Sequence, residues 1–386
     1  MSRTRRQRVR CTTSTPCSSN SRPSGPRSTR SMPDVSVAET TQPPEGSAVE
    51  QTLTPHDSRK KGHAQVSEWI ARFALVSIFA GMVLVFAILR PESFATMANL
   101  QTILNGAAVL TIFACAVTVV LLAGEFDLSF PYVADSSALI IGVLVTTTMA
   151  STGASTLLAV VIGIMVATGF GLVNGFAVAL GKVPSFVATL AVGSIAAGIE
   201  LATQGKISGG LKQISTMSLP ESLQNLGTMT IGSTDLRLGV LVAGIVALVT
   251  WVLLRFTVFG RHVLAVGGNA EAAFLASVPV ARTRIAAFAY VGLLAGIASI
   301  IGLIQRGYYN GASPGLLLQA YTVAFLGTAF LAMRRFTILG TIVAVLFIQT
   351  LANGLALLNE PTWIVSVVNG VVLLAAVVLT RRRGRV

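Results

Sequence analysis

The chain has 386 residues, of which 53% are hydrophobic and 11% are charged. A soluble domain is about one quarter charged, so this composition excludes an ordinary water-soluble protein and indicates a membrane protein. Much of the net charge of +13 lies near the two ends of the chain, where it flanks apolar segments, and this position favours a role in membrane orientation over nucleic-acid binding.

Residues 1–67 form a basic tail that is rich in Ser, Thr, Pro and Arg and nearly lacks large apolar side chains. Such a segment cannot bury a core, so we predict that it is disordered. Its composition is compatible with an organelle-targeting peptide or with a later translation start, for example at Met32. Residues 68–386 are predicted to form one transmembrane domain.

Ten apolar segments follow the tail, and each is about long enough to cross a hydrocarbon core of roughly 30 Å as a helix. The sequence therefore predicts an all-α polytopic membrane protein. The third and fourth segments are separated only at residues 151–153, because no charge occurs between residues 136 and 181. The predicted segments are residues 71–90, 100–123, 130–150, 155–181, 184–203, 238–256, 284–305, 316–333, 336–358 and 362–380.

The positions of Lys and Arg predict the orientation of these segments. If the basic tail is cytoplasmic, the connections on its side hold more positive charges than the outward connections, and both termini are cytoplasmic. The inward set is Lys182, Arg255, Arg261, Arg282, Arg284, Arg334 and Arg335, and the outward set is Arg90, Lys206, Lys212, Arg237 and Arg306. Two connections are long enough to receive a partner, an outward one at about 204–237 and an inward one at about 257–283.

The inward connection carries the strongest local pattern. The pair Gly267 and Gly268 is expected to break the chain, and Asn269 after it is a good N-cap residue. A short helix is then predicted over Ala270–Ser277, with Glu271 in its first turn, where an acid is favourable.

The small side chains of this predicted helix suit either of two roles. Ala272, Ala273 and Ala276 fall on one face, which is narrow enough to lie in a groove of another protein. The alternative is an interfacial linker helix without a partner.

Five ionisable or polar residues near the predicted helices are candidates for function, because charge inside a membrane is costly. We interpret Glu125 and Asp127 as caps of the third helix. Asp135 lies about two turns into that helix, where it would line a polar cavity or have a structural role. Glu200 and Gln204 are expected either at a solvated helix end or in contact with sugar hydroxyls.

The inward connection resembles the cytoplasmic coupling loop of the permeases of ribose-type ABC importers. The matching residues there are Phe259, Gly260, Arg261, Ala265, Gly267, Gly268, Asn269, Ala272, Ala273, Ser277, Val280 and Arg284. Residues 124–129 resemble the Gly-x-x-Asp-Leu-Ser pattern of the same family, and Asn174-Gly175 with residues 183–190 resembles a further family segment. Together these motifs cover most of residues 95–380. The chain departs from the family at residues 130–132 and at residues 331–336.

The resemblance implies the permease subunit of an importer that moves a monosaccharide such as ribose or xylose across a bacterial inner or plasma membrane. It implies three protein partners besides membrane lipid: an ATP-binding cassette ATPase, a periplasmic or extracellular sugar-binding protein, and a second permease copy in a homodimer. The ATPase would contact Gly267, Gly268, Asn269, Glu271 and Ala272. The candidate pathway residues are Asp135, Asn174 and Glu200.

The chain is expected to use no cofactor, catalytic residue or metal of its own. It has no Gly-x-x-x-x-Gly-Lys-Ser/Thr motif, since Lys182 after Gly181 is followed by Val183, so ATP must be used by the partner subunit. All three histidines lie outside the predicted spans, which argues against an enzyme. Nucleosides and branched-chain amino acids are alternative cargoes, and an ion-coupled carrier that uses Asp135 is a further alternative.

Overall fold

The computed structural model describes residues 76–148, 153–206, 213–230, 232, 234–330 and 336–383, and the predicted tail at 1–67 with Met32 lies outside them. Within the described residues, every regular element is helical except for one pair of two-residue strands. The all-α prediction is therefore confirmed.

Six described helices are long and apolar enough to cross a membrane. They belong to α3 (Met97–Leu122), α5 (Gly153–Ala179), α6 (Ser185–Lys206), α8 (Leu238–Phe256), α11 (Val280–Arg306) and α13 (Ile338–Leu357). Four further apolar helices are shorter: Val76–Leu89, Phe130–Thr146, which begins with α4 (Phe130–Val143), and parts of α12 (Gly315–Phe330) and α14 (Thr362–Arg383). These ten helices follow the order of the ten predicted segments, and α4 continues into a π-helical turn at Leu144–Thr148. The break predicted at residues 151–153 lies largely outside the described residues.

Short elements occupy the connections. They are α2 (Pro91–Phe94), β1 (Gln213–Ile214), a 3-10 turn (Thr216–Ser218), α7 (Glu221–Thr228), α9 (Val258–Gly268), α10 (Ala270–Leu275) and β2 (Tyr308–Tyr309). The strands pair antiparallel, with Gln213 opposite Tyr309 and Ile214 opposite Tyr308. Both long connections predicted from the sequence therefore contain regular structure.

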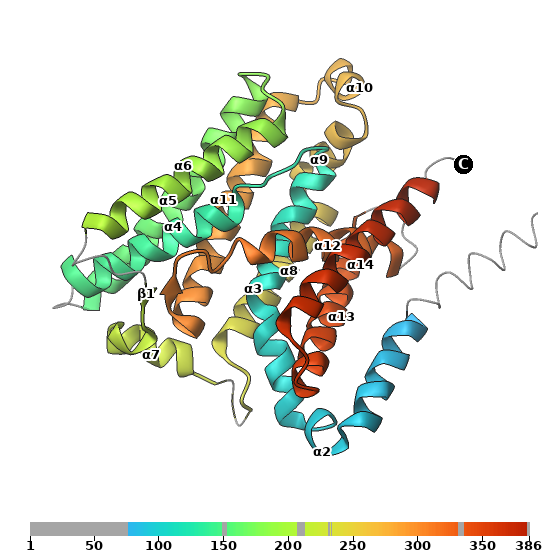
Figure 1. Cartoon of the computed structure of the whole chain (residues 1–386). Helices are drawn as coiled ribbons and strands as arrows, with labels where there is room; N and C mark the ends of the chain where they lie inside the picture. Colours follow the sequence, from blue (N-terminus) through green and yellow to red (C-terminus); the bar gives the residue numbers. More distant parts are fainter. Residues whose placement is uncertain are drawn as a thin grey trace, which may run out of the picture. The chain divides into compact units, whose positions relative to one another are not determined.

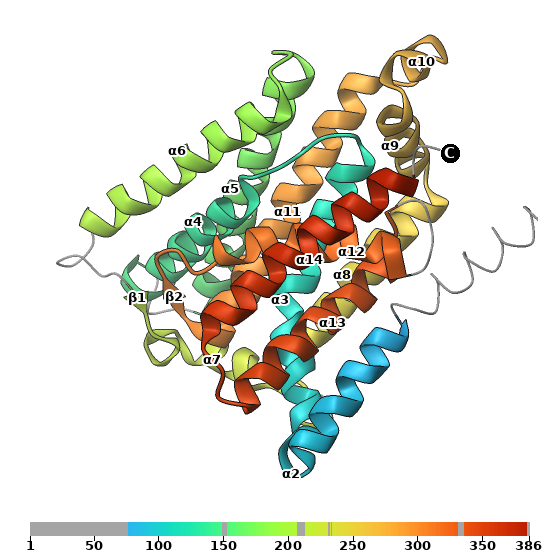
Figure 2. The same cartoon turned by 45° about the vertical axis from the view of Figure 1, so that its right-hand side comes forward.

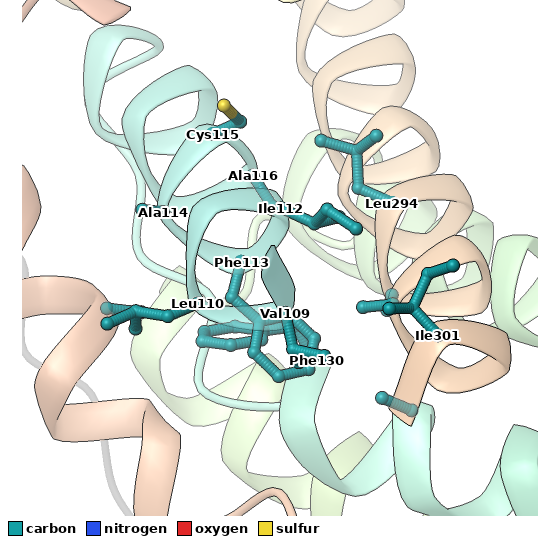
Figure 3. Packing of buried hydrophobic residues seen from close by; sticks show 14 of the residues in the cluster. Val109, Leu110, Ile112, Phe113, Ala114, Cys115, Ala116, Phe130, Leu294 and Ile301 are labelled. Carbon is teal, nitrogen blue, oxygen red and sulfur yellow. The ribbon is translucent and has the colours of Figure 1, made fainter. Parts of the chain in front are cut away.

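Helix α3 lies in the middle of the core and packs against α8, α11, α12 and α13. An apolar helix with partners on all sides has no polar face, and the segment Ile112–Val117 of α3 is fully buried. Figure 3 shows Phe113 of α3 against Phe130 at the start of α4, and their ring centroids are 5.0 Å apart. Ile112 lies towards Leu294 of α11 in the same view.

Glycine lets α5 and α11 approach closely, because a residue without a side chain leaves room for the neighbouring backbone. A β-carbon on Gly171 would lie 2.4 Å from the carbonyl oxygen of Phe288, and one on Gly292 would lie 2.5 Å from that of Ala167. Any larger residue at either position would push the two backbones apart.

The connections gather at two ends of the helical bundle (Figures 1 and 2). One end carries the α3–α4 and α5–α6 connections together with α9 and α10, and the C-terminal end of α14 lies on this side. The other end carries α7 and the β1–β2 pair. We call the first the α10 end and the second the strand end.

Candidate functional site

Helix α9 ends at Gly268 and α10 begins at Ala270, so the chain breaks directly at the end of the glycine pair, as predicted. The close approach of α9 to α3 explains the first glycine. A β-carbon on Gly267 would lie 1.9 Å from the carbonyl oxygen of Leu122, whereas one on Gly268 would meet no atom within 4 Å. Gly267 is thus packed against α3, whereas Gly268 has open space beside it.

The predicted N-cap at Asn269 is confirmed. Its side-chain Oδ1 accepts hydrogen bonds from the backbone N–H groups of Glu271 and Ala272, each at 3.0 Å. These contacts satisfy two donors that the first turn of α10 leaves without an intrahelical partner.

The predicted small face of α10 is exposed only in part, at Ala272 and Ala276. Ala273, the middle member of the predicted small face, is buried against the chain itself. Phe274 and Leu275 are instead 70% and 80% exposed. Large apolar side chains that extend from a short helix suit contact with another protein or a lipid surface.

The connection between α3 and α4 separates the two acids that the sequence predicts as caps. Asp127 supports the start of α4 indirectly: its Oδ1 accepts from the N–H of Ser129, the N-cap residue, at 2.7 Å and from its hydroxyl at 2.6 Å. Burial raises the pKa of Asp127, and these hydrogen bonds oppose that shift. Glu125 does not cap: its Oε1 lies 2.7 Å from Nε of Arg284, at the start of α11.

Asn174, a candidate pathway residue, lies beside this connection. Its side chain is buried, and its Nδ2 donates to the hydroxyl of Ser129 at 2.7 Å. It therefore belongs to the group around Asp127 and is separate from the other two candidate pathway residues.

Asp135 lines a small polar cavity, as predicted. The backbone N–H of Ser313 donates to its Oδ2 at 3.0 Å. The cavity has a volume of about 10 Å³, enough for roughly one water molecule, and Ser299, Arg306 and Tyr308 also line it. Its walls come from α4, α11 and the α11–α12 connection.

Glu200 joins the same cluster through Tyr308. The phenol of Tyr308 donates to Oε1 of Glu200 at 2.6 Å and accepts from Nε2 of Gln204, and Asn310 donates to Oε1 of Gln204 at 3.4 Å. Glu200 and Gln204 are buried, so the interpretation as a solvated helix end is wrong. Burial, followed by the neighbouring carboxylate of Glu200, raises the pKa of Tyr308. The structure therefore brings Asp135 and Glu200 together through a tyrosine.

Tyr308 and Ser313 are residues of the candidate site that the sequence patterns do not predict. Both lie in the α11–α12 connection, which folds back onto α4 and α6 only in the tertiary structure. In the part of the chain that the structure describes, no group of three His, Cys, Asp or Glu side chains is arranged to hold a metal ion.

Comparison with known proteins identifies the class. Residues 99–377 match the family model described as the permease component of the branched-chain amino acid transport system. The match covers most of the chain, so the chain belongs to this family of membrane permeases. It is a multi-pass transport protein and not an enzyme.

Three individual relatives of the chain are permeases of sugar transporters. The chain is 33% identical to the ribose import permease of Bacillus subtilis (strain 168) over 307 residues, which are 78% of this chain and 90% of the relative. It is 31% identical over 320 residues to the L-arabinose ABC transporter permease of Azospirillum brasilense, with 82% of this chain and 90% of the relative covered. It is 30% identical over 295 residues to the ribose import permease of Escherichia coli (strain K12), with 75% and 88% covered. No solved structure matches the chain.

Proposed function

We propose that the chain is the membrane-spanning permease of an ABC importer that moves a monosaccharide, with a pentose of the ribose or xylose kind as the preferred cargo. The observation that carries this proposal is the similarity to the ribose import permease of Bacillus subtilis, which extends over 90% of that protein. A xylose transport permease of Haemophilus influenzae is 36% identical over a shorter region of 134 residues.

The α10 end is the proposed docking site for the ATPase subunit, at Gly267, Gly268, Asn269, Glu271 and Ala272. The exposed Phe274 and Leu275 support it, because a partner would bury them. Hydrolysis of ATP in that subunit would drive transport, and the permease would need no cofactor.

We further propose ten membrane spans in a bacterial inner membrane, with both termini in the cytoplasm. The ten apolar helices and the bacterial sources of the relatives support this topology. The α5–α6 connection, which holds Lys182, and α9, which holds Arg261, lie at the α10 end, as expected if that end faces the cytoplasm.

The strand end would then face outward and receive sugar from a binding protein. Asp135 and Glu200 are the proposed pathway residues there, because carboxylates and amides in a polar cavity suit hydroxyl groups. Asn174 would line the pathway nearer to the cytoplasm. A second copy of the chain would complete the pathway as a homodimer.

Branched-chain amino acids are the second candidate cargo, and the description of the matching family model supports them. A zwitterion needs a cation for its carboxylate as well as an acid for its ammonium group. Arg306, which lines the cavity, would supply this positive charge.

Reconstitution tests the proposal. The permease is placed in liposomes with its ATPase subunit, and ATP hydrolysis and uptake are measured with binding protein loaded with ribose, arabinose, xylose or leucine. We expect one of the sugars to stimulate hydrolysis and uptake together. If only the leucine-loaded binding protein stimulated hydrolysis and uptake, the cargo would be an amino acid. If the chain accumulated solute on an ion gradient without ATP, the ABC mechanism would be refuted.

A further inference from the structure

The α3–α4 connection, residues 124–129, is irregular backbone that is held by side chains from distant helices. The N–H of Phe126 donates to the hydroxyl of Ser185 at 3.2 Å, and the N–H of Leu128 donates to that of Thr189 at 3.1 Å. Ser185 and Thr189 are one turn apart on α6. Non-helical backbone at the edge of a membrane protein needs such partners, because lipid offers none.

Tyr321 of α12 holds the peptide groups between these two contacts. Its hydroxyl accepts from the N–H of Asp127 at 3.0 Å and donates to the carbonyl oxygen of Asp127 at 2.8 Å. Its ring also stacks on Phe126, with centroids 6.0 Å apart. One side chain thus fixes both polar backbone groups of a single buried residue.

The same connection contacts the segment proposed to meet the ATPase. A β-carbon on Gly124 would lie 3.2 Å from Cα of Gly267, so the two backbones are almost in contact. Glu125 forms the ion pair with Arg284, which follows α10 in the chain. A displacement of α9 and α10 would therefore reach residues 124 and 125 directly.

The connection also controls the start of α4. Asp127 caps that helix through Ser129, and Ser129 accepts from Asn174 of α5. Asp135, which lines the cavity, lies further along the same helix. This one loop therefore connects the α10 end to four helices, namely α4, α5, α6 and α12.

We propose that Tyr321 and Thr189 are positioning residues that transmit movement from the ATPase-docking segment to α6 and α12. The two hydroxyls bind residues 126–128 to those helices. Gly124 and Glu125 contact α9 and α11, so they would move with these two helices. Movement of the docking segment then repositions all four helices together. This inference rests on the proposed function of the α10 end.

The test removes single hydroxyl groups. Tyr321→Phe keeps the ring and its stacking on Phe126 but leaves both backbone groups of Asp127 without their partner. Tyr290→Phe is the matched control, because the Tyr290 ring also packs near α9, with its centroid 6.5 Å from that of Phe259, but its hydroxyl bonds that of Thr250 at 2.8 Å instead of the loop. Both variants are reconstituted with the ATPase subunit and with binding protein loaded with ribose, arabinose or xylose, whichever stimulates the unsubstituted chain.

We expect Tyr321→Phe to lower the amount of sugar moved per ATP hydrolysed by at least about fivefold, the lower end of typical coupling between two sites. Hydrolysis itself should continue, and Tyr290→Phe should keep the normal ratio. Equal ratios in the two variants would overturn the inference. Absence of stimulated hydrolysis with the unsubstituted chain would instead refute the proposed function on which the inference rests.

A second measurement needs no cargo. Thr189→Val removes the hydroxyl at nearly constant volume, and Thr189→Ser restores it. Hydrogen exchange of residues 124–130 in the purified permease should be faster in Thr189→Val and in Tyr321→Phe, and normal in Thr189→Ser. Unchanged exchange in all three variants would show that the loop does not depend on these hydroxyls and would contradict the proposal.

Discussion

The two ends of the helical bundle are built from different interactions. At the α10 end, the backbone takes part in each main contact: Gly267 lies directly against the end of α3, and loop N–H groups donate to side-chain hydroxyls of α6 and α12. At the strand end, side chains meet around a cavity: Glu200, Gln204 and Tyr308 form one hydrogen-bonded group, and Asp135 binds Ser313.

The two kinds of contact suit two different tasks, the transmission of movement and the binding of a solute. Such contacts transmit displacement well, because at Gly267 no side chain, and in the loop hydrogen bonds only one well-packed side chain, separates the moving parts. A network of side chains around a small cavity can rearrange by rotamer changes, which suits the admission of a polar solute. On the proposed function, the α10 end suits the transmission of movement and the strand end suits adaptable contact, so substitutions at the two ends should have different effects.

The largest effect is expected for Gly267→Ala, because its β-carbon would lie 1.9 Å from the Leu122 carbonyl oxygen. Relief requires movement of a helix, and we expect a loss of about 3 kcal/mol or more in unfolding free energy. Gly268→Ala is the matched control, since a β-carbon there meets nothing within 4 Å. It should be neutral or slightly stabilising in the same thermal unfolding assay in detergent. Equal behaviour of the two variants would contradict the close backbone contact.

The ion pair between Glu125 and Arg284 should give the next largest effect. Glu125→Ala leaves the partly buried guanidinium unpaired, at a cost of about 2 kcal/mol. The double variant Glu125→Arg with Arg284→Glu should recover part of this loss, as a double-mutant cycle on unfolding would detect. Additive losses in the cycle would indicate that the pair contributes no coupling between the loop and α11.

At the strand end we expect a smaller loss. Tyr308→Phe removes the phenol that donates to Glu200 and leaves a buried carboxylate oxygen without its partner, at a cost of about 1–2 kcal/mol. Tyr309→Phe is the control, because Tyr309 is adjacent and 43% exposed. Thermal unfolding and sugar uptake should both change for the first variant and neither for the second. If Tyr308→Phe changed neither thermal unfolding nor sugar uptake, the hydrogen-bonded group of Glu200, Gln204 and Tyr308 would not contribute as proposed.

The smallest effect, a gain, is expected at the end of α10. Ser277 has a φ of 62°, and the N–H of Val278 bonds to the carbonyl oxygen of Ala273 in a helix-terminating turn. Glycine suits this left-handed position, so Ser277→Gly should stabilise the segment by about 0.5–1 kcal/mol. Ser277→Ala, which keeps a β-carbon, should give no gain in the same unfolding assay. Destabilisation by glycine would show that the Ser277 side chain makes a contact of its own.

The sequence predicts the helices well and the site only in part. Long apolar segments place each helix to within a few residues, because membrane thickness limits helix length. The cap at Asn269 and the cavity position of Asp135 also follow from local rules. The pairing of Glu125 with Arg284 and the role of Tyr308 do not, because each joins residues more than 100 positions apart in the chain.

One local rule held, but tertiary packing supplies part of its reason. A glycine pair usually interrupts a helix, and α9 does end at Gly268. Packing against α3 requires the first glycine, and the contact outweighs the intrinsic cost of glycine in a helix, about 1 kcal/mol per residue. The tertiary contact that decides this position cannot be seen in the local sequence.

The central claim is that the α10 end faces the cytoplasm and meets the ATPase, while the strand end faces outward. Cysteines introduced at Leu275 and Met217, which are 80% and 85% exposed at opposite ends, test it directly after Cys11 and Cys17 are replaced by serine. With a membrane-impermeant maleimide, we expect Met217→Cys to react in spheroplasts and Leu275→Cys to react only in inside-out vesicles. Bound ATPase subunit should protect Leu275→Cys. Labelling of Leu275→Cys from outside, or of both cysteines from one side, would contradict the account.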